Sequence, residues 1–427
     1  MMEDLNIRNL KRLKLKKCIN CAEIPAIWQL SLLENLHLEE MKGLRHIVGG
    51  TGKHVKGSQS LITFSALKVL IIEYLLNLEN WREEDSDLVD FPNLNKLDIS
   101  RCGKLKSIPV RMPLLASLRV YDSSEIKLHN ISNLPMLSSL HIQVANSCSE
   151  PDAFRPPKTL EKMKIIGFEN VIPLEEEEED QLICCQTKSL YILTIFNSNC
   201  FFSCGPTEVV ALGFWKYFEA LEYLEISNCS AVEFWPEEEF RSLKCLKNLW
   251  IISCLNLRGS LQVAVSMSSS CEHWEDSLPH LELLRITDCS ELVEIPICSK
   301  SLTNIIIWDC PKLSREGLAH LTNLSELKTI HIDGLTNWGA WPDNMEHLPS
   351  LEELRIYSCP GIESFPEGLQ QRLSSLQYLV IDGCPALERR CRVGGDYWHL
   401  VSDIPNLRIV NERESFPKKL LNCMSGR

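Results

Sequence analysis

The sequence of 427 residues lacks features that several large protein classes need. No apolar run approaches the roughly 18 residues of a membrane-spanning helix, so we predict no membrane span. The first residues, MMEDLNIRNLKRLKLKK, contain no apolar core of about 7–15 residues and no small-residue cleavage site, so we predict no signal peptide. There are 44 basic and 57 acidic residues, and the net charge of −13 disfavours a nucleic-acid partner.

Cysteine is also sparse for a disulfide scaffold. The chain has 19 cysteines, an odd number and only about 4% of its length. Without secretion the thiols are expected to stay reduced, and we predict a cytoplasmic protein. Leucine, by contrast, occurs 65 times, which is about 15% of the chain. We therefore expect a fold that uses leucine repeatedly in one role.

The leucines belong to an internal repeat, which is the strongest signal in the sequence. Four segments follow the pattern L-x-x-L-x-I-x-x-C-x-x-(L/V/I)-x-x-(I/F/W)-P without a gap, at residues 94–109, 221–236, 281–296 and 351–366. Looser copies begin at Leu10, Leu33, Leu67, Leu115, Leu137, Leu160, Leu190, Leu246, Leu302, Leu327, Leu376 and Ile404. About 16 copies spaced by about 26 residues fall in the range of leucine-rich repeats.

Each copy predicts a short strand followed by a turn. In Leu351-x-x-Leu354-x-Ile356 the apolar residues alternate with Arg355 and Tyr357, so Leu354 and Ile356 face a core and the other two face outward. One copy cannot bury its apolar face, whereas stacked copies form a continuous core. We therefore predict an α/β solenoid, a leucine-rich-repeat horseshoe with a concave parallel sheet of about 16 irregular repeats. Its convex side would be mostly loops and short helical turns.

The spacing between copies is uneven, and four longer intervals predict surface insertion loops. They cover about residues 47–62, 171–188, 199–212 and 262–279. No linker is long enough to mark a domain boundary. We predict one leucine-rich-repeat domain over residues 1–427, with no nucleotide-binding or coiled-coil domain in the chain.

Eight cysteines share one offset within the repeat, eight residues after its first leucine. They are Cys18, Cys102, Cys229, Cys254, Cys289, Cys310, Cys359 and Cys384. A cluster of thiols could indicate a metal or redox site. One cysteine per turn instead favours a buried spine of small apolar side chains, so we interpret these residues as structural.

No catalytic or cofactor motif is complete. Residues 47–54, IVGGTGKH, lack the first glycine and the serine or threonine of a phosphate-binding loop. Cys18 and Cys21 form C-x-x-C, but His37 and His46 are too far apart for the usual zinc pattern. Neither G-x-S-x-G nor H-E-x-x-H occurs. We predict no enzymatic activity, no cofactor and no metal.

The outward strand positions are the candidate binding residues. In the C-terminal half they combine aromatic, arginine and acidic side chains, and aromatic residues and arginine anchor many protein interfaces. The candidates are Arg285, Trp308, His331, Asp333, Arg355, Tyr357 and Asp382. We predict a protein-binding surface, although a solvated sheet with scattered aromatics fits the same pattern.

The repeat resembles the intracellular leucine-rich repeats of plant nucleotide-binding disease-resistance receptors (NLRs) over residues 10–410. The stretch CPALERRCRVGGDYWHLVSDIPNLRIV (384–410) is similar to the end of the coiled-coil-type receptors. The matching residues are Cys384, Pro385, Leu387, Arg390, Cys391, Trp398, Ile404 and Pro405. Tyr397 departs from that pattern, because it stands between Asp396 and Trp398.

The resemblance implies a protein-interaction module of plant innate immunity. Such repeats would recognise a pathogen effector or a guarded host protein, or restrain a nucleotide-binding module. The basic start at residues 11–17 is compatible with docking on an acidic face. Two alternatives stay open: substrate-recognition repeats of a ubiquitin ligase, which CPKLSREGLAHL (310–321) resembles, and a truncated, non-functional receptor remnant.

Overall fold

The computed structural model describes most of the repeat region. The described residues are 8–24, 26–48, 62–82, 89–109, 111–126, 129–143, 157–167, 189–202, 215, 218–260, 278–296, 299–338, 341 and 348–410. The four predicted insertion loops lie mostly outside them. The chain forms two compact units, Met1–Leu221 and Glu222–Arg427, each described by itself below. The single domain expected from the sequence stays a prediction.

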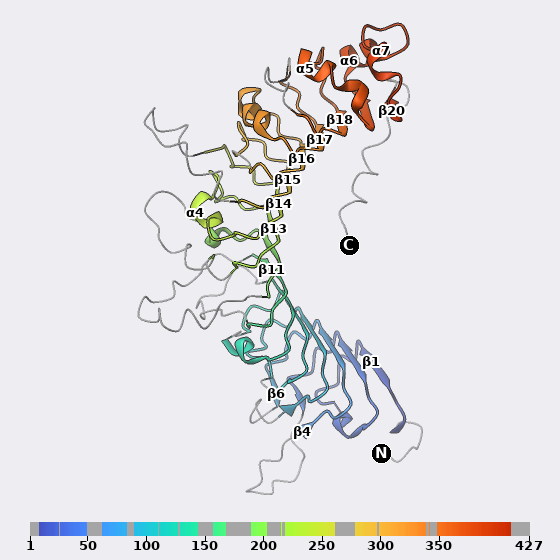
Figure 1. Ribbon diagram of the computed structural model, residues 1–427. Coiled ribbons are helices and arrows are strands. Elements are labelled where there is room, and N and C mark those ends of the chain that lie inside the picture. The colour runs from blue at the N-terminus through green and yellow to red at the C-terminus, as the bar shows by residue number, and fades with distance from the viewer. Residues whose placement is uncertain are drawn as a thin grey trace, which may run out of the picture. The chain divides into compact units, whose positions relative to one another are not determined.

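The first unit is built on eight parallel strands of five residues, paired in chain order (Figure 1). They are β1 (Arg12–Lys16), β2 (Asn35–Glu39), β5 (Val69–Glu73), β8 (Lys96–Ser100), β9 (Ser117–Tyr121), β10 (Ser139–Gln143), β11 (Lys162–Ile166) and β12 (Ile192–Phe196). Two short parallel pairs form on the return path: β3 (His46–Val48) with β6 (Asn80–Arg82), and β4 (Ile62–Thr63) with β7 (Val89–Asp90). In its described part the unit also has three 3-10 turns: η1 (Ile27–Gln29), η3 (His129–Asn133) and η6 (Asn199–Phe201).

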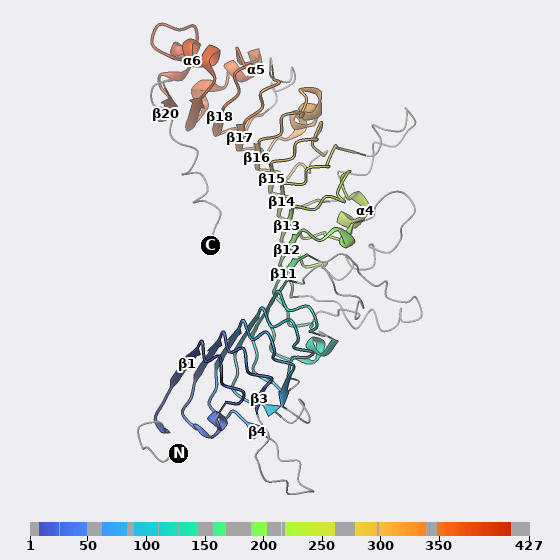
Figure 2. The same ribbon diagram turned by 180° about the vertical axis from the view of Figure 1, so that it is seen from behind.

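The second unit repeats the plan with eight further parallel strands (Figure 2). They are β13 (Tyr223–Ser227), β14 (Asn248–Ile252), β15 (Leu283–Thr287), β16 (Asn304–Trp308), β17 (Thr329–Asp333), β18 (Glu353–Tyr357), β19 (Tyr378–Asp382) and β20 (Asn406–Ile409). Its helical turns are α4 (Glu237–Phe240), η9 (Glu316–Asn323), α5 (Glu367–Gln370), η11 (Leu373–Ser375), α6 (Pro385–Cys391) and α7 (Trp398–Val401). Among the described residues, no helix is long and apolar enough to cross a membrane.

The predicted parallel-strand solenoid is confirmed. Each of these sixteen strands begins two residues after one of the predicted repeat starts, as β18 does after Leu351. Leu354 and Ile356 on β18 are completely buried, whereas Arg355 and Tyr357 are half-buried on the open face of the sheet. This alternation follows from the period of two along a strand. On β1, Leu13 and Leu15 are only half-buried, because no described strand precedes them.

A left-handed residue ends most of the strands. The residue directly after the strand has a positive φ, for example 53° at Arg101 and 55° at Asp288. Its N–H extends the ladder by one bond: Arg101 donates to the carbonyl of Tyr121 at 2.9 Å, and Asp288 donates to that of Trp308 at 2.8 Å. The chain then turns back under the strand, which is where the repeat cysteine lies.

At the end of the second unit, α6 packs against β19, and α7 packs against η11 and α6. Glu388 is buried, and its carboxylate accepts hydrogen bonds from the N–H of Cys384 at 2.9 Å and from Arg392 Nη2 at 2.9 Å. Tyr397 is also buried, and its hydroxyl accepts a hydrogen bond from Arg390 Nη1 at 3.2 Å. The residue that departs from the family pattern is therefore part of the core of this terminal segment.

Candidate protein-binding face of the second unit

The open face of the second unit is formed by the first, third and fifth residues of its strands. The register places third residues side by side: Trp250 pairs with Arg285, Arg285 with Ile306, and Ile306 with His331. Six residues of this face form what we call the aromatic cluster. They are Tyr223, Trp250, Arg285, Trp308, His331 and Tyr357, and all are half-buried.

Arg285 lies between two tryptophans of the cluster. Its guanidinium carbon is 4.7 Å from the centre of the Trp250 ring and 5.4 Å from that of Trp308. A guanidinium over an indole face is attracted by the ring quadrupole, which makes that face partially negative. Arg285 Nε also donates to Thr287 Oγ1 at 3.4 Å. These contacts hold the cation at the surface of the sheet.

His331 joins Trp308 to Tyr357. The His331 ring is edge-on to Trp308 with centres 5.5 Å apart, and 5.1 Å from the Tyr357 ring. Trp308 Nε1 donates to His331 Nε2 at 3.2 Å, which requires a neutral imidazole. Burial, and then the charges of Arg355 and Arg285, lower the pKa of His331 to about 4. The cluster is therefore neutral at this residue at physiological pH.

On β13, Glu225 lies beside the cluster residue Tyr223, and the sequence analysis singles out neither of them. The Tyr223 ring lies 5.3 Å from that of Trp250. Its hydroxyl donates to Glu225 Oε2 at 3.1 Å, and Ser227 Oγ donates to Glu225 Oε1 at 3.0 Å. Both residues are outward positions of the segment LEYLEIS, so the alternation rule could have found them.

The structure places all seven predicted binding residues on neighbouring strands, and ring and cation–π contacts join four of them, Arg285, Trp308, His331 and Tyr357. Asp333 and Asp382 lie beside Tyr357 in the register, half-buried at the fifth positions of β17 and β19. Arg355 forms a close ion pair with Glu353 on its own strand, although its Nε has no hydrogen bond of good geometry. The binding role of the seven residues stays a prediction.

Seven of the eight cysteines of the predicted spine, Cys102, Cys229, Cys254, Cys289, Cys310, Cys359 and Cys384, are completely buried. Each thiol lies near the carbonyl two residues earlier, for example Cys359 Sγ and Tyr357 O at 3.0 Å. Burial raises the pKa of Cys102 to about 12, which keeps the thiol protonated and unreactive. The prediction of a buried position is wrong for the eighth, Cys18, which is only half-buried because it belongs to the first described repeat; Cys21 is exposed.

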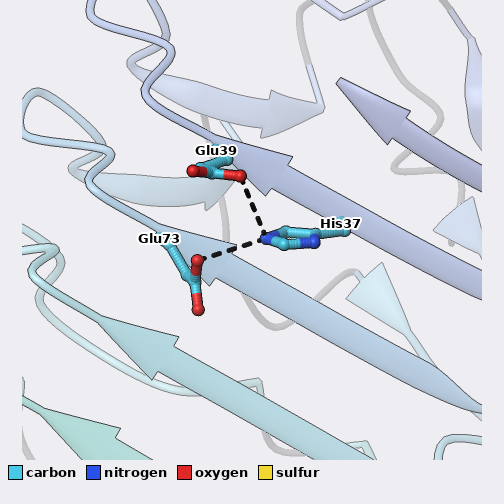
Figure 3. Close-up of side chains that lie close together, drawn as sticks. All are labelled: His37, Glu39 and Glu73. Atoms are coloured by element: carbon cyan, nitrogen blue, oxygen red, sulfur yellow. Dashed lines mark hydrogen bonds and ion pairs between the residues drawn. The ribbon is translucent and has the colours of Figure 1, made fainter. Parts of the chain in front are cut away.

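Three residues of the first unit could in principle hold a metal, and sequence analysis did not group them. The ligand atoms of His37, Glu39 and Glu73 lie within 4.8 Å of one another (Figure 3). His37 Nε2 is 3.3 Å from Glu73 Oε2 and 3.8 Å from Glu39 Oε2.

Two ammonium groups already neutralise this cluster. Lys14 Nζ and Lys16 Nζ lie 2.8 and 2.6 Å from the Glu39 carboxylate. Their hydrogen bonds lower the pKa of Glu39 to about 2. A divalent cation would have to compete with both lysines, so the geometry fits a charge network better than a metal centre.

The fold and this open face define a leucine-rich-repeat protein that presents a surface suited to protein contacts. A family model described as plant disease resistance protein RPS2-like, leucine-rich repeats, matches residues 1–120. An RPP13-like disease resistance protein 1 of Arabidopsis thaliana is 26% identical over 274 residues, which are 61% of this chain and 22% of that protein. A second Arabidopsis disease resistance protein is 23% identical over 91% of this chain and 30% of its own length.

The chain is thus a leucine-rich-repeat protein whose repeats are similar to those of plant disease resistance proteins. It spans less than a third of the length of these two relatives. Among solved structures, an internalin from Listeria monocytogenes aligns at 14% identity over 82% of this chain and 87% of that one, with a TM-score of 0.35. The fold assignment rests on the strand ladder and its repeats.

Proposed function

We propose that the chain recognises a pathogen effector or a guarded host protein through the aromatic cluster of its second unit, in the cytoplasm and without catalysis. The supporting observation is the contact series Tyr223–Trp250–Arg285–Trp308–His331–Tyr357 across neighbouring strands. Aromatic side chains and arginine supply most anchor residues of protein interfaces, because they bury a large area at low entropic cost.

Restraint of a nucleotide-binding module is the less supported part of the earlier prediction. The lysines at the start of the first unit face acidic residues within the unit: Lys14 and Lys16 pair with Glu39, and Lys17 lies 3.9 Å from Glu40. Cations that are already paired offer less attraction to an acidic surface. We therefore place partner recognition first.

Co-immunoprecipitation from leaf tissue tests the proposal. Residues 1–427 would be expressed with candidate effectors and, separately, with nucleotide-binding modules of the same plant. The double variant Trp308→Ala/Tyr357→Ala should weaken binding of an effector or guarded protein by about tenfold or more. Tyr121→Ala is the matched control, because it removes a ring from the fifth position of β9 in the first unit. Equal recovery of every partner with the wild type and the double variant would contradict the proposal.

A further inference from the structure

Arg285 is a half-buried cation that forms no ion pair with another described residue. Its Nε donates to Thr287, and among the described residues no carboxylate forms an ion pair with its guanidinium. The negative charge of the Glu225 carboxylate attracts Arg285 electrostatically, but that carboxylate already accepts hydrogen bonds from Tyr223 and Ser227. Arg285 therefore carries a charge that its surroundings do not directly balance.

Two other arginines at third strand positions are paired. Arg119 Nη1 lies 3.5 Å from Asp98 Oδ2, and Arg355 forms its ion pair with Glu353. At Arg285, desolvation by partial burial lowers the pKa of the guanidinium, which is the direction expected of a cation that lacks compensation. Such a group costs free energy, and an anion supplied from outside would reduce that cost.

The two indole rings also prepare Arg285 for binding. They lie 4.7 and 5.4 Å from its guanidinium carbon, so the side chain is held before a partner arrives. A guanidinium presents parallel N–H groups to a carboxylate, and a preformed orientation lowers the entropic cost of that contact. Trp250 Nε1 is a further donor without an acceptor among the described residues.

We propose that Arg285, flanked by Trp250 and Trp308, is a clamp for one aspartate or glutamate side chain of a protein partner. Apolar residues beside that acidic residue would pack on the two indole rings. Charge complementarity supports this occupant, because the unpaired cation needs an anion and the rings need apolar contacts. Since the whole chain carries a net charge of −13, an acidic tract would be repelled, and a single acidic residue is expected. The inference rests on the proposed function and specifies its ligand.

A displayed library of random peptides, selected on residues 1–427, tests the clamp. Peptides from the wild type should carry one acidic residue beside apolar ones. Arg285→Met keeps a long apolar stem and should weaken their binding by about 10- to 100-fold. Arg285→Lys keeps the charge but lacks the planar guanidinium, so it should weaken peptide binding several-fold. Arg119→Met removes the same charge from a third strand position in the first unit and should leave Kd unchanged.

The peptide itself provides the second half of a double-mutant cycle. A peptide with glutamine in place of its acidic residue should bind the wild type weakly and Arg285→Met no worse. The melting temperature of each variant is measured first, and Arg285→Lys gives the comparison if Arg285→Met does not fold.

The outcomes separate the clamp from the binding face. The clamp is overturned if the selected peptides bind Arg285→Met as tightly as the wild type. It is also overturned if peptides that lose binding to Trp308→Ala carry no acidic residue. Either outcome leaves the proposed binding face standing. Selected peptides that bind Trp308→Ala and Tyr357→Ala as well as the wild type overturn the proposed function and the clamp together.

Discussion

On strands β1 to β9 of the first unit, charged side chains on the open face pair with one another. Glu39 contacts Lys14 and Lys16, and Asp98 contacts Arg119. On strands β13 to β18 of the second unit, the equivalent positions carry rings around Arg285, which forms no ion pair within the described part of the chain. The interiors are alike, since both use leucine and isoleucine at the second and fourth strand positions.

The difference teaches how one repeat serves two purposes. Side chains at outward positions do not determine whether the strand forms, because the core face already does. Where outward charges pair with one another, they have little favourable interaction energy left for a partner protein. Where rings surround an unpaired cation, part of the favourable contact is left for a ligand. We therefore expect changes of the core chemistry to affect both units equally and changes of the face to affect them differently.

The largest expected effect tests the shared interior. Cys102 in the first unit and Cys254 in the second are completely buried, and burial raises the pKa of both thiols. Cys21 and Cys245 are exposed. Alkylation of the native protein, followed residue by residue by mass spectrometry, should be at least about 100-fold slower at Cys102 and Cys254. Rapid labelling of either one would show that its unit opens and that the interiors differ.

The next effect concerns pH and the neutral His331. Its pKa of about 4 lies below the ordinary value near 6.5, so the unfolded chain binds more protons between these values. Stability from this residue is fully present above pH 6.5 and is lost as the pH falls towards 4. At pH 5 the loss is on the order of 1–2 kcal/mol. Protonation would also remove the acceptor of Trp308 Nε1 and add a cation between Arg285 and Arg355.

Urea unfolding at pH 7 and pH 5 measures this loss. His331→Gln keeps an acceptor and removes the titration, so its stability should change less between the two pH values. The matched variant is His141→Gln in the first unit, where burial and then Lys164 and Arg119 lower the pKa of His141 to about 4. A wild type that is equally stable at both pH values would contradict the neutral assignment.

A smaller expected effect distinguishes the contribution of the Trp308 ring from that of its hydrogen bond to His331. Trp308→Phe keeps a ring beside Arg285 but loses the N–H that donates to His331. It should lower the free energy of unfolding by about 1 kcal/mol. Trp250→Phe is the control, because Trp250 Nε1 has no acceptor and its loss breaks no hydrogen bond among the described residues. Equal changes of the free energy of unfolding for the two variants would show that the Trp308–His331 bond does not contribute.

The fold could be predicted from the sequence because its signal is local. Each of the sixteen repeat strands begins two residues after a repeat start, and the alternation of Leu354 and Ile356 with Arg355 and Tyr357 already identifies the open face. Arg285 and Trp308 could be named as candidates for the same reason. The stacking of Arg285 on Trp250 could not, because it joins residues of neighbouring repeats whose insertion lengths vary.

Contacts between distant residues were the part that sequence reasoning missed. The sequence pattern groups His37 with Cys18, Cys21 and His46, whereas the structure pairs it with Glu73, 36 residues away. Tyr397 was an unexplained departure from a pattern. Its hydroxyl accepts a hydrogen bond from Gln370 Nε2 at 3.3 Å and its ring lies 5.6 Å from that of Phe365. Nothing in the local sequence indicates either contact.

The smallest expected effect tests the paired face of the first unit. Glu39→Gln removes the carboxylate shared by Lys14 and Lys16, so like charges on β1 lose their partner and the melting temperature should fall at low salt. The difference from the wild type should shrink as salt rises towards about 1 M, since these lysines are about half exposed and screening weakens their interactions.

Glu40→Gln is the control, because Glu40 only approaches Lys17, at 3.9 Å. The pKa of Glu39, about 2, also predicts that its contribution is present above pH 4.5 and is lost as the pH falls from 4.5 towards 2. A Glu39→Gln protein that melts with the wild type at low salt would mean that the pairing does not stabilise the fold. The contrast between the ion-paired open face of the first unit and the proposed binding face of the second would then rest on Arg285 alone.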